Sequence, residues 1–383
     1  MPLYKNRPEP SGRMGLLWAL APVSDAAIIE FGSMGHMIYA DKFLGHTGLV
    51  KYAKLVTTHL SEKDIALGIT KRLEDSVKEI VRKKEAKAIF LLPSSVPEMI
   101  GTDLEAIGGE LQFSYPDIPI VTFKAGNFKA TKEQGMEEAY YSLVKKFSEF
   151  HAFEAADRLS KGTLRFNLIG PACDWSRFQS DAREISRMLT GAFHMEEAAI
   201  FGSSSTVESL LKMSQADITL VLRKDGIKAA KELERQYKIP YLYLTPYGYT
   251  GTLQWIERLE EVLAKKADIS FLEQEKQEVS HVVSHCREWV NYRKAKAKLW
   301  VGGEDELSGG LQEFAVTDLG FLPGEGEIHM SDLHELRENP GKCSTEIRRS
   351  TLSNDINPYE APFMGFRGAM NLCSLWYQHL TTG

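Results

Sequence analysis

The chain has 383 residues, of which 43% are hydrophobic and 26% are charged, a composition that excludes wholesale disorder. Its 46 basic and 52 acidic residues give a formal net charge of -6, which argues against a chain-wide basic surface for nucleic acid. The longest apolar stretch, Met14 to Phe31, is interrupted by Pro22 and by polar residues, so no membrane span is expected. Because Met1 to Arg13 lacks the apolar run of a signal peptide, we expect a cytoplasmic protein.

The four cysteines indicate neither a disulfide framework nor a zinc ribbon. None of them forms a C-x-x-C pair with another. They stand at Cys173, Cys286, Cys343 and Cys373.

Short apolar runs alternate with amphipathic runs through the first 160 residues. Such alternation is typical of a parallel sheet covered by helices on both faces. The predicted strands are Ala26 to Phe31, Ala88 to Leu92 and Ile118 to Phe123, and the predicted helices are Val77 to Lys84 and Glu137 to Phe150.

The same pattern restarts after the polar, glycine-containing segment Arg158 to Thr163, which predicts a domain boundary. Three further strands and three helices are expected before a long charged helical stretch at Glu273 to Lys296. The strands are Arg165 to Gly170, Ile218 to Leu222 and Pro240 to Leu244, and the helices are Ser180 to Leu189, Lys224 to Tyr237 and Gly251 to Lys265.

A third unit opens with a strand at Lys298 to Gly302 and a helix from about Asp305 to Leu319. Between Leu322 and Pro358 no convincing apolar strand is seen, and a last helix is predicted at Gly365 to Leu380. The predicted fold class is therefore α/β, with multiple Rossmann-like, doubly wound parallel-sheet domains of which the third is shortened. The predicted domains are residues 1–160, residues 161–290 with a trailing helix, and residues 291–383 with the C-terminal helix.

The segment Phe31 to His36 follows the first predicted strand, where doubly wound folds place their ligands. Two glycines permit a sharp turn, so that Ser33 and His36 stand at the mouth of the sheet. The imidazole of His36 could move protons, bind a metal or donate to an anion, or it could be a turn histidine bonded to nearby backbone.

A second segment, Pro93 to Asp103, follows another predicted strand. Ser94 and Ser95 offer hydroxyl groups and a helix N-cap, and Glu98 completes the expected ligand contacts of this segment. Free backbone N–H groups at such a helix start can bind an anion, although plain capping explains the pattern equally well.

Two further loops carry candidate ligand groups. Ser203, Ser204 and Ser205 form a hydroxyl-rich loop before a helix, and the spacing of Ser205 and Glu208 also matches a capping box. In Thr245 to Thr252, Gly248 allows close backbone approach, and Tyr247 could either wall a planar ligand or pack between domains.

His281 and His285 lie four residues apart and could share a metal, although a solvated helix face explains them better. Several signatures of other activities are missing. The sequence has no P-loop, no G-x-S-x-G elbow, no kinase motif set and no full G-x-G-x-x-G after its first strand.

Taken in order, the motifs resemble the nitrogenase component 1 family, which includes nitrogenase α and β subunits, cofactor scaffolds and tetrapyrrole reductases. Pro22 to Ala26 (PVSDA), the first strand and Gly32 to His36 (GSMGH) resemble the family's P-I-x-D-A and H-G-P-x-G-C. Thr58 to Leu73 resembles T-x-L-x-E-K-D-x-x-x-G-x-x-K-x-L. Further resemblances lie in Ser95 to Ala106 (C-x-x-x-x-I-G-D-D-x-E-A), Leu168 to Gly170 (N-I-I-G), Pro246 to Thr252 (P-x-G-x-x-G-T) and Pro362 to Met370 (P-x-x-G-Y-x-G-A-M).

The resemblance implies an iron–sulfur cluster held by cysteines, yet this chain departs from the family at those positions. They fall on about Pro10, on His36 and on Ser95. Proline cannot ligate, and a serine hydroxyl is a poor substitute for a thiolate. We therefore expect no standard iron–sulfur cluster from this chain alone, and its cofactor and metal content stay unknown.

Two functions follow as hypotheses. In the first, the chain is an oxidoreductase subunit with His36 as proton donor, paired with a homologous partner subunit or with itself and fed by a P-loop iron–sulfur reductase. In the second, it is a non-redox binding or scaffold protein for a small anionic or metal-containing ligand held between its domains. The missing cysteines favour the second hypothesis, and the ordered glycine motifs are compatible with both.

Overall fold

The structure is a computed structural model that describes residues 10–49, 51–124, 130–150, 162–293, 297–349, 357 and 359–381, without the side chains of His36, Tyr39 and Phe43. Within these residues, no helix combines the length and the apolar character that crossing a membrane would require.

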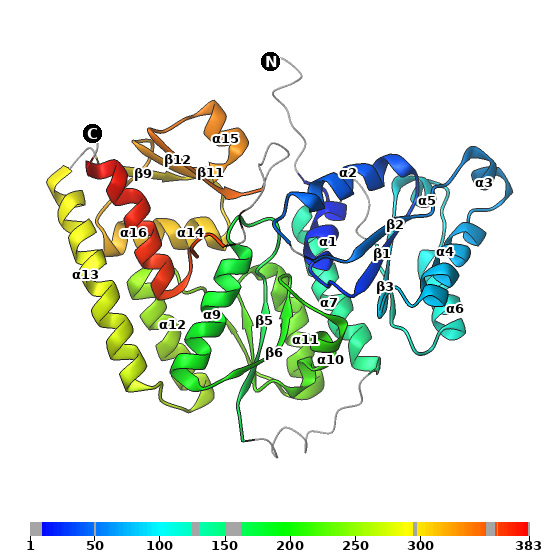
Figure 1. Ribbon diagram of the computed structural model, residues 1–383, viewed down its shortest axis with the longest axis horizontal. Coiled ribbons are helices and arrows are strands. Elements are labelled where there is room, and N and C mark those ends of the chain that lie inside the picture. The colour runs from blue at the N-terminus through cyan, green and yellow to red at the C-terminus, as the bar shows by residue number, and fades with distance from the viewer. Residues whose placement is uncertain are drawn as a thin grey trace. The chain divides into compact units, whose positions relative to one another are not determined.

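Three parallel four-stranded sheets form the framework, which confirms the predicted α/β class with Rossmann-like sheets (Figure 1). The strand orders are β2-β1-β3-β4, β6-β5-β7-β8 and β10-β9-β11-β12. The strands are β1 (Ala26–Phe31), β2 (Lys54–Thr57), β3 (Ala88–Pro93), β4 (Ile120–Thr122), β5 (Arg165–Ile169), β6 (Glu196–Phe201), β7 (Ile218–Val221), β8 (Tyr241–Tyr243), β9 (Lys298–Val301), β10 (Leu322–Pro323), β11 (Ile328–Asp332) and β12 (Cys343–Arg348).

The chain divides into two compact units. The first unit comprises residues 1–155, 199–214 and 225–238 and contains the sheet of β1 to β4. Its two central strands, β1 and β3, are buried along their whole length, which explains their nearly unbroken apolar sequences. Its helices are α1 (Gly12–Leu20), α2 (Met34–Gly45), α3 (Glu62–Leu67), α4 (Thr70–Lys83), α5 (Ser95–Met99), α6 (Leu104–Ser114), α7 (Lys132–Phe150), α10 (Val207–Leu211) and α11 (Ile227–Tyr237).

The second unit comprises residues 156–198, 215–224 and 239–383 and contains β5, β7 and β8 together with the sheet of β9 to β12. The boundaries predicted near residues 160 and 290 stay a prediction. The helices of this unit are α9 (Phe178–Phe193), α12 (Gly248–Leu263), α13 (Ile269–Arg293), α14 (Glu306–Glu313), α15 (Leu333–Glu338) and α16 (Gly365–Thr381).

The segment after residue 320 corrects the sequence analysis, because β10, β11 and β12 lie where no strand was expected. In β11 the buried positions include His329 and Ser331. These two polar residues interrupt the run of apolar residues from which a buried strand is usually predicted. A partner in the fold allows each to be buried: His329 Nδ1 lies 2.8 Å from the Asn339 carbonyl oxygen, and the Ser331 hydroxyl donates to Glu335.

The helix predicted from Asp305 to Leu319 also needs a correction. The α-helix α14 ends at Glu313, and the next five residues, Phe314–Asp318, form a π-helical turn. The carboxylate of Asp318 in this turn accepts the backbone N–H groups of Tyr249 and Thr250 at 2.8 and 3.0 Å. The turn therefore supplies the first backbone groups of α12 with an acceptor, a contact that helical periodicity does not encode.

Candidate functional site

The carboxyl ends of β1 and β3 meet at the centre of the first unit's sheet. In the order β2-β1-β3-β4 the chain leaves these neighbouring strands toward opposite edges, which makes this point the topological switch point where doubly wound sheets bind ligands. Gly32 follows β1 and Ser94 follows β3. We call Gly32, Thr58 and Ser94 the switch-point site.

Backbone and side-chain hydrogen bonds fix the geometry of this site. The Gly32 N–H donates to Thr58 Oγ1 at 3.0 Å, and the Ser94 N–H donates to the Phe31 carbonyl at 3.0 Å. A Cβ atom added to Gly32 would lie 2.0 Å from Ser94 Oγ, so only glycine permits this approach of the two strand ends.

Ser94 carries an unused hydroxyl. The residue is only 1% exposed, and Ser94 Oγ has no hydrogen-bond partner among the residues that the structure describes. It does not cap α5 with its side chain, contrary to the capping interpretation of the sequence. A buried hydroxyl without a partner is unfavourable, and such groups are candidates for binding a ligand or water.

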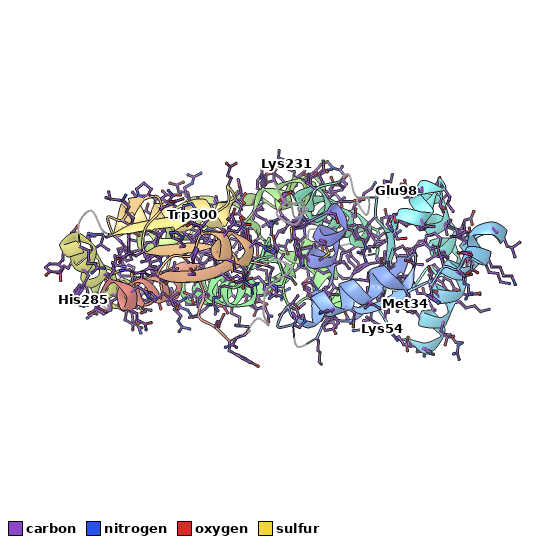
Figure 2. All side chains as sticks on the ribbon, turned by 90° about the horizontal axis from the view of Figure 1, so that it is seen from above. Met34, Lys54, Glu98, Lys231, His285 and Trp300 are labelled. Carbon is purple, nitrogen blue, oxygen red and sulfur yellow. The ribbon has the colours of Figure 1, made fainter. Side chains whose placement is uncertain are left out.

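The other predicted ligand residues of the first unit that follow β1 and β3 lie near the switch-point site in the chain. Ser33 and Ser95 are half-buried at the starts of α2 and α5, and Glu98 is exposed on α5 (Figure 2). The backbone of His36 lies in α2, but its side chain is outside the described residues, so its role stays a prediction.

Each of the three helices that follow the carboxyl ends of β1, β2 and β3 carries exposed apolar side chains. Met99 is 85% exposed and Ile38 is 59% exposed, although burial of such side chains in a soluble protein is favourable. We call this set the apolar rim; it consists of Met34 and Ile38 on α2, Ile65 and Leu67 on α3, and Met99 and Ile100 at the end of α5. Apolar side chains exposed together in this way are typical of a protein interaction surface.

The serine-rich loop before α10 lies elsewhere in the first unit. Ser205 pairs with Val23, just before β1, so the loop is placed at the amino-terminal end of that strand rather than at the switch-point site. The Ser205 hydroxyl donates to the carbonyl oxygens of Ile200 and Ser203. The three hydroxyls therefore do not join the switch-point residues, and their role as ligand groups stays a prediction.

The capping box predicted at Ser205 and Glu208 is displaced by one residue. Thr206 is the N-cap, and its side chain and that of Ser209 exchange hydrogen bonds with each other's backbone N–H groups. The carboxylate of Asp25 also accepts the Val207 N–H at 2.7 Å, which ties this helix start to β1.

In the second unit, Tyr247 is buried and packs in the interior. Its ring lies where a Cβ atom on Gly310 would be, 2.0 Å from Tyr247 Cδ2, and its backbone pairs with Met364. Its hydroxyl has no partner among the described residues, and burial raises the pKa of this phenol. Gly248 has φ +70°, which suits the start of α12. The roles of Tyr247 and Gly248 toward a ligand stay a prediction.

A buried ion pair at the ends of β5 and β7 was missed by the sequence analysis. Arg223 Nη1 lies 2.8 Å from Asp174 Oδ1, both side chains are 3% exposed, and the guanidinium lies 4.9 Å from the centre of the Trp175 ring. The sequence gives one indication of this pair, because an aspartate and an arginine each follow a predicted strand. Their pairing depends on the strand order, which the sequence does not state.

Two more carboxylates of the second unit have shifted pKa values because of burial and hydrogen bonds. Burial alone would raise the pKa of Asp305, but hydrogen bonds and charge from Arg348 lower it to about 2. Burial raises the pKa of Asp181 to about 7, against the opposing effect of the backbone N–H groups of Met364 and Phe363, which donate to Asp181 Oδ1 at 3.0 and 2.7 Å. Asp181 thereby anchors the segment that leads into α16.

The residues present do not fit a family-type iron–sulfur cluster. All four cysteines are free, buried and in the second unit, remote in sequence from the Pro10, His36 and Ser95 positions. Among the described residues, no group of three or more His, Cys, Asp and Glu side chains could hold a metal ion. His281 and His285 line a pocket of about 580 Å³ with Cys286, Cys373 and Tyr377, but among the described residues these side chains form no group that could hold a metal ion.

Known proteins similar to this chain point to a single family. The family described as Nitrogenase component 1 type Oxidoreductase matches residues 11–325. The nitrogenase iron-molybdenum cofactor biosynthesis protein NifE of Clostridium pasteurianum is 23% identical over 348 residues, which are 89% of this chain and 72% of that protein. One subunit of the light-independent protochlorophyllide reductase of Chloroflexus aggregans is 28% identical over 221 residues, which are 57% of this chain and only 38% of that protein.

A solved structure supports the same fold. The structure described as "Nitrogenase Cp1 at pH 6.5" matches with a TM-score of 0.73 over 98% of this chain and 93% of that chain. The sequence identity is 15%, so this likeness concerns the fold alone.

Proposed function

Because the chain belongs to the nitrogenase component 1 type oxidoreductase family over residues 11–325, we propose that it is one subunit of a reducing complex. In this complex, electrons from a separate ATP-dependent iron–sulfur reductase reach a substrate through a partner that carries the cluster. The observation that carries the proposal is the switch-point site, where the family's sheet topology is kept and its thiolate ligands are not.

The apolar rim supports a partner at this site. Its six side chains lie on the helices that follow β1, β2 and β3, and each is between 37% and 85% exposed. A homologous subunit or a second copy of this chain would bury them, with a gain of about 25 cal/mol for each Å² removed from water. One relative is itself named as a subunit of a reductase, which is consistent with this arrangement.

The chain's own contribution would then be polar rather than redox-active. The hydroxyls of Ser94, Ser33 and Ser95 would donate to or accept from the substrate, and His36 would transfer a proton because an imidazole titrates near neutral pH.

Metal analysis tests the proposal. The chain is purified without oxygen, both alone and after coexpression with an iron–sulfur reductase and a homologous subunit of the same family. We expect a colourless chain without stoichiometric iron, and a coloured complex that oxidises the reduced reductase in the presence of MgATP. Stoichiometric iron and sulfide in the isolated chain would contradict the proposed division of labour.

Replacing His36 tests the proton-transfer role. His36→Ala should lower the MgATP-dependent oxidation of the reductase by the complex by about 10²-fold or more, as expected for loss of a general acid. The melting temperature should change by no more than about 2 °C. The matched control is His194→Asn, which replaces a surface histidine of the second unit with a residue that tolerates its left-handed backbone. Equal losses of activity and stability in His36→Ala would mean a structural role.

The alternative is a non-redox protein that carries a small anionic or metal-containing ligand. It is favoured by the missing thiolates and by the NifE relative, which is named for cofactor biosynthesis and matches 89% of this chain. A complex that binds such a cargo yet never oxidises the reductase would establish this function instead.

A further inference from the structure

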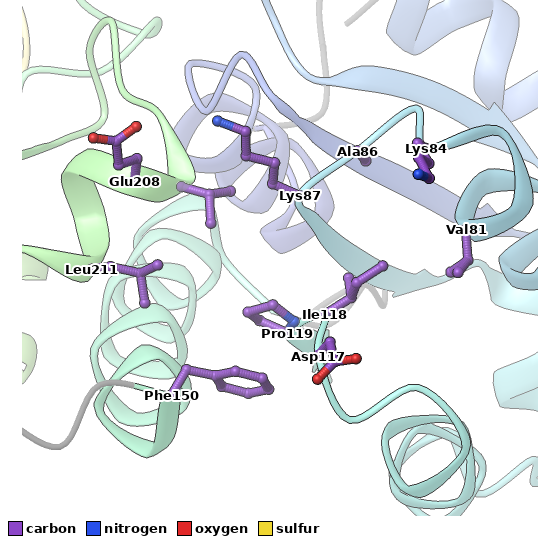
Figure 3. A pocket seen from close by; sticks show the side chains of 11 residues that line it. Val81, Lys84, Ala86, Lys87, Asp117, Ile118, Pro119, Phe150, Glu208 and Leu211 are labelled. Atoms are coloured by element: carbon purple, nitrogen blue, oxygen red, sulfur yellow. The ribbon is translucent and has the colours of Figure 1, made fainter.

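A second candidate binding site lies at the other end of the first unit's sheet. A pocket of about 560 Å³ is formed by the end of α4, the loops that precede β3 and β4, the end of α7, and α10 (Figure 3). Ala86 and Lys87 precede β3 and Pro119 precedes β4, so the pocket is at the amino-terminal edge, opposite the switch-point site. Its volume is in the range of small-molecule sites.

The interior of the pocket is apolar. Val81, Ile118, Phe150 and Leu211 come from four different elements and line the same space (Figure 3). Each of them is only half-buried, so part of its apolar surface is available to a ligand. A ligand with an aliphatic or aromatic body would gain free energy by covering this surface.

The four charged residues of the lining differ in whether the fold already uses them. Lys87 Nζ lies 3.3 Å from Asp25 Oδ2, and Glu208 Oε1 lies 2.9 Å from Lys212 Nζ. Lys84 and Asp117, by contrast, have neither an ion pair nor a side-chain hydrogen bond within the described part of the chain. The pocket therefore presents one unused cation and one unused anion beside an apolar interior.

We propose that this pocket binds a zwitterion with an apolar body, of the chemical class of free leucine or phenylalanine. The ligand's carboxylate would pair with the Lys84 ammonium, its ammonium group with the Asp117 carboxylate, and its side chain would cover Ile118 and Phe150. A simple fatty acid or a simple amine could satisfy only one of the two charged residues, which is why a ligand with both charges fits best. The site is independent of the function proposed for the switch-point site.

Calorimetric titration of the full chain with three probes tests the charge pattern. The probes are L-phenylalanine, N-acetyl-L-phenylalanine, which lacks the cation, and L-phenylalanine amide, which lacks the carboxylate. L-Phenylalanine should bind saturably, and each of the other two probes should bind about tenfold more weakly, because each loses one charge-assisted hydrogen bond. Absence of saturation by L-phenylalanine at roughly 10 mM would overturn the proposal, as would equal binding of the three probes.

Substitutions assign the two contacts. Lys84→Gln should weaken L-phenylalanine about tenfold and remove its advantage over the amide, and Asp117→Asn should remove its advantage over the N-acetyl compound. The matched control is Lys83→Gln, because Lys83 is the neighbouring residue but pairs with Glu79 on α4 and does not line the pocket. If Lys83→Gln weakens binding as much as Lys84→Gln does, the assignment of the carboxylate contact is wrong.

Discussion

Two strand-end regions with the same topology differ in how the chain uses its polar groups. At the carboxyl ends of β1 and β3, glycine and serine follow the strands, and the Ser94 hydroxyl has no partner among the described residues. At the carboxyl ends of β5 and β7, Asp174 and Arg223 follow the strands and neutralise each other in the interior. The first region therefore has a polar group that can bind a ligand or water, whereas the polar groups of the second region pair with each other and stabilise the fold.

Breaking the ion pair of the second region should have the largest effect. Arg223→Met removes the guanidinium that pairs with the buried Asp174 carboxylate, and we expect the free energy of unfolding to fall by about 3–5 kcal/mol. Urea unfolding followed by circular dichroism measures this. The double variant with Asp174→Leu should recover much of the loss, since an apolar side chain then replaces the buried carboxylate. Loss of less than about 1 kcal/mol in Arg223→Met would show that the pair does not stabilise this region.

The pH dependence of stability should come next in size, through Asp181. Its pKa is about 7 in the folded chain and about 4 when unfolded, so between these values the folded state holds a proton that the unfolded state releases. The free energy of unfolding therefore decreases as pH rises from 4 to 7, by roughly 3 kcal/mol from this group.

Asp181→Asn isolates this contribution. The amide keeps an oxygen that can accept the Phe363 and Met364 N–H groups, but it does not titrate. Urea unfolding at several pH values should show a flatter profile for this variant than for the control Asp75→Asn, which changes an exposed aspartate of α4. Identical profiles for the two variants would mean that Asp181 is already ionised at pH 4.

The smallest effects belong to the first region. Gly32→Ala places a Cβ atom against Ser94 and should cost about 1–3 kcal/mol of stability, a loss that adding Ser94→Gly should relieve. Ser94→Ala should leave the free energy of unfolding unchanged or raise it by about 1 kcal/mol, since no hydrogen bond is lost and a buried hydroxyl without a partner is removed. Gly35→Ala, in α2 with open space around it, is the matched control and should be neutral or stabilising. A destabilising Ser94→Ala would reveal a partner for the hydroxyl.

The sequence was a good guide wherever apolar residues follow one regular period. β1 and β3 are unbroken apolar runs and were predicted nearly to the residue, and α7 was recovered from its helical spacing. Local pattern does not predict β11, where buried His329 and Ser331 are satisfied by partners that lie outside the strand. It also missed β2, whose four residues are at most half-buried.

The sequence by itself determined the family and the position of Gly32 and Ser94 after two buried strands, because glycine, serine and apolar runs are read along the chain. Only the tertiary structure decided that Gly32 and Ser94 touch, that Asp174 meets Arg223, and that the Ser205 loop lies at the amino-terminal end of β1. The physical reason is that strand order and side-chain packing join residues far apart in the chain, and local patterns of polarity carry no record of those pairings.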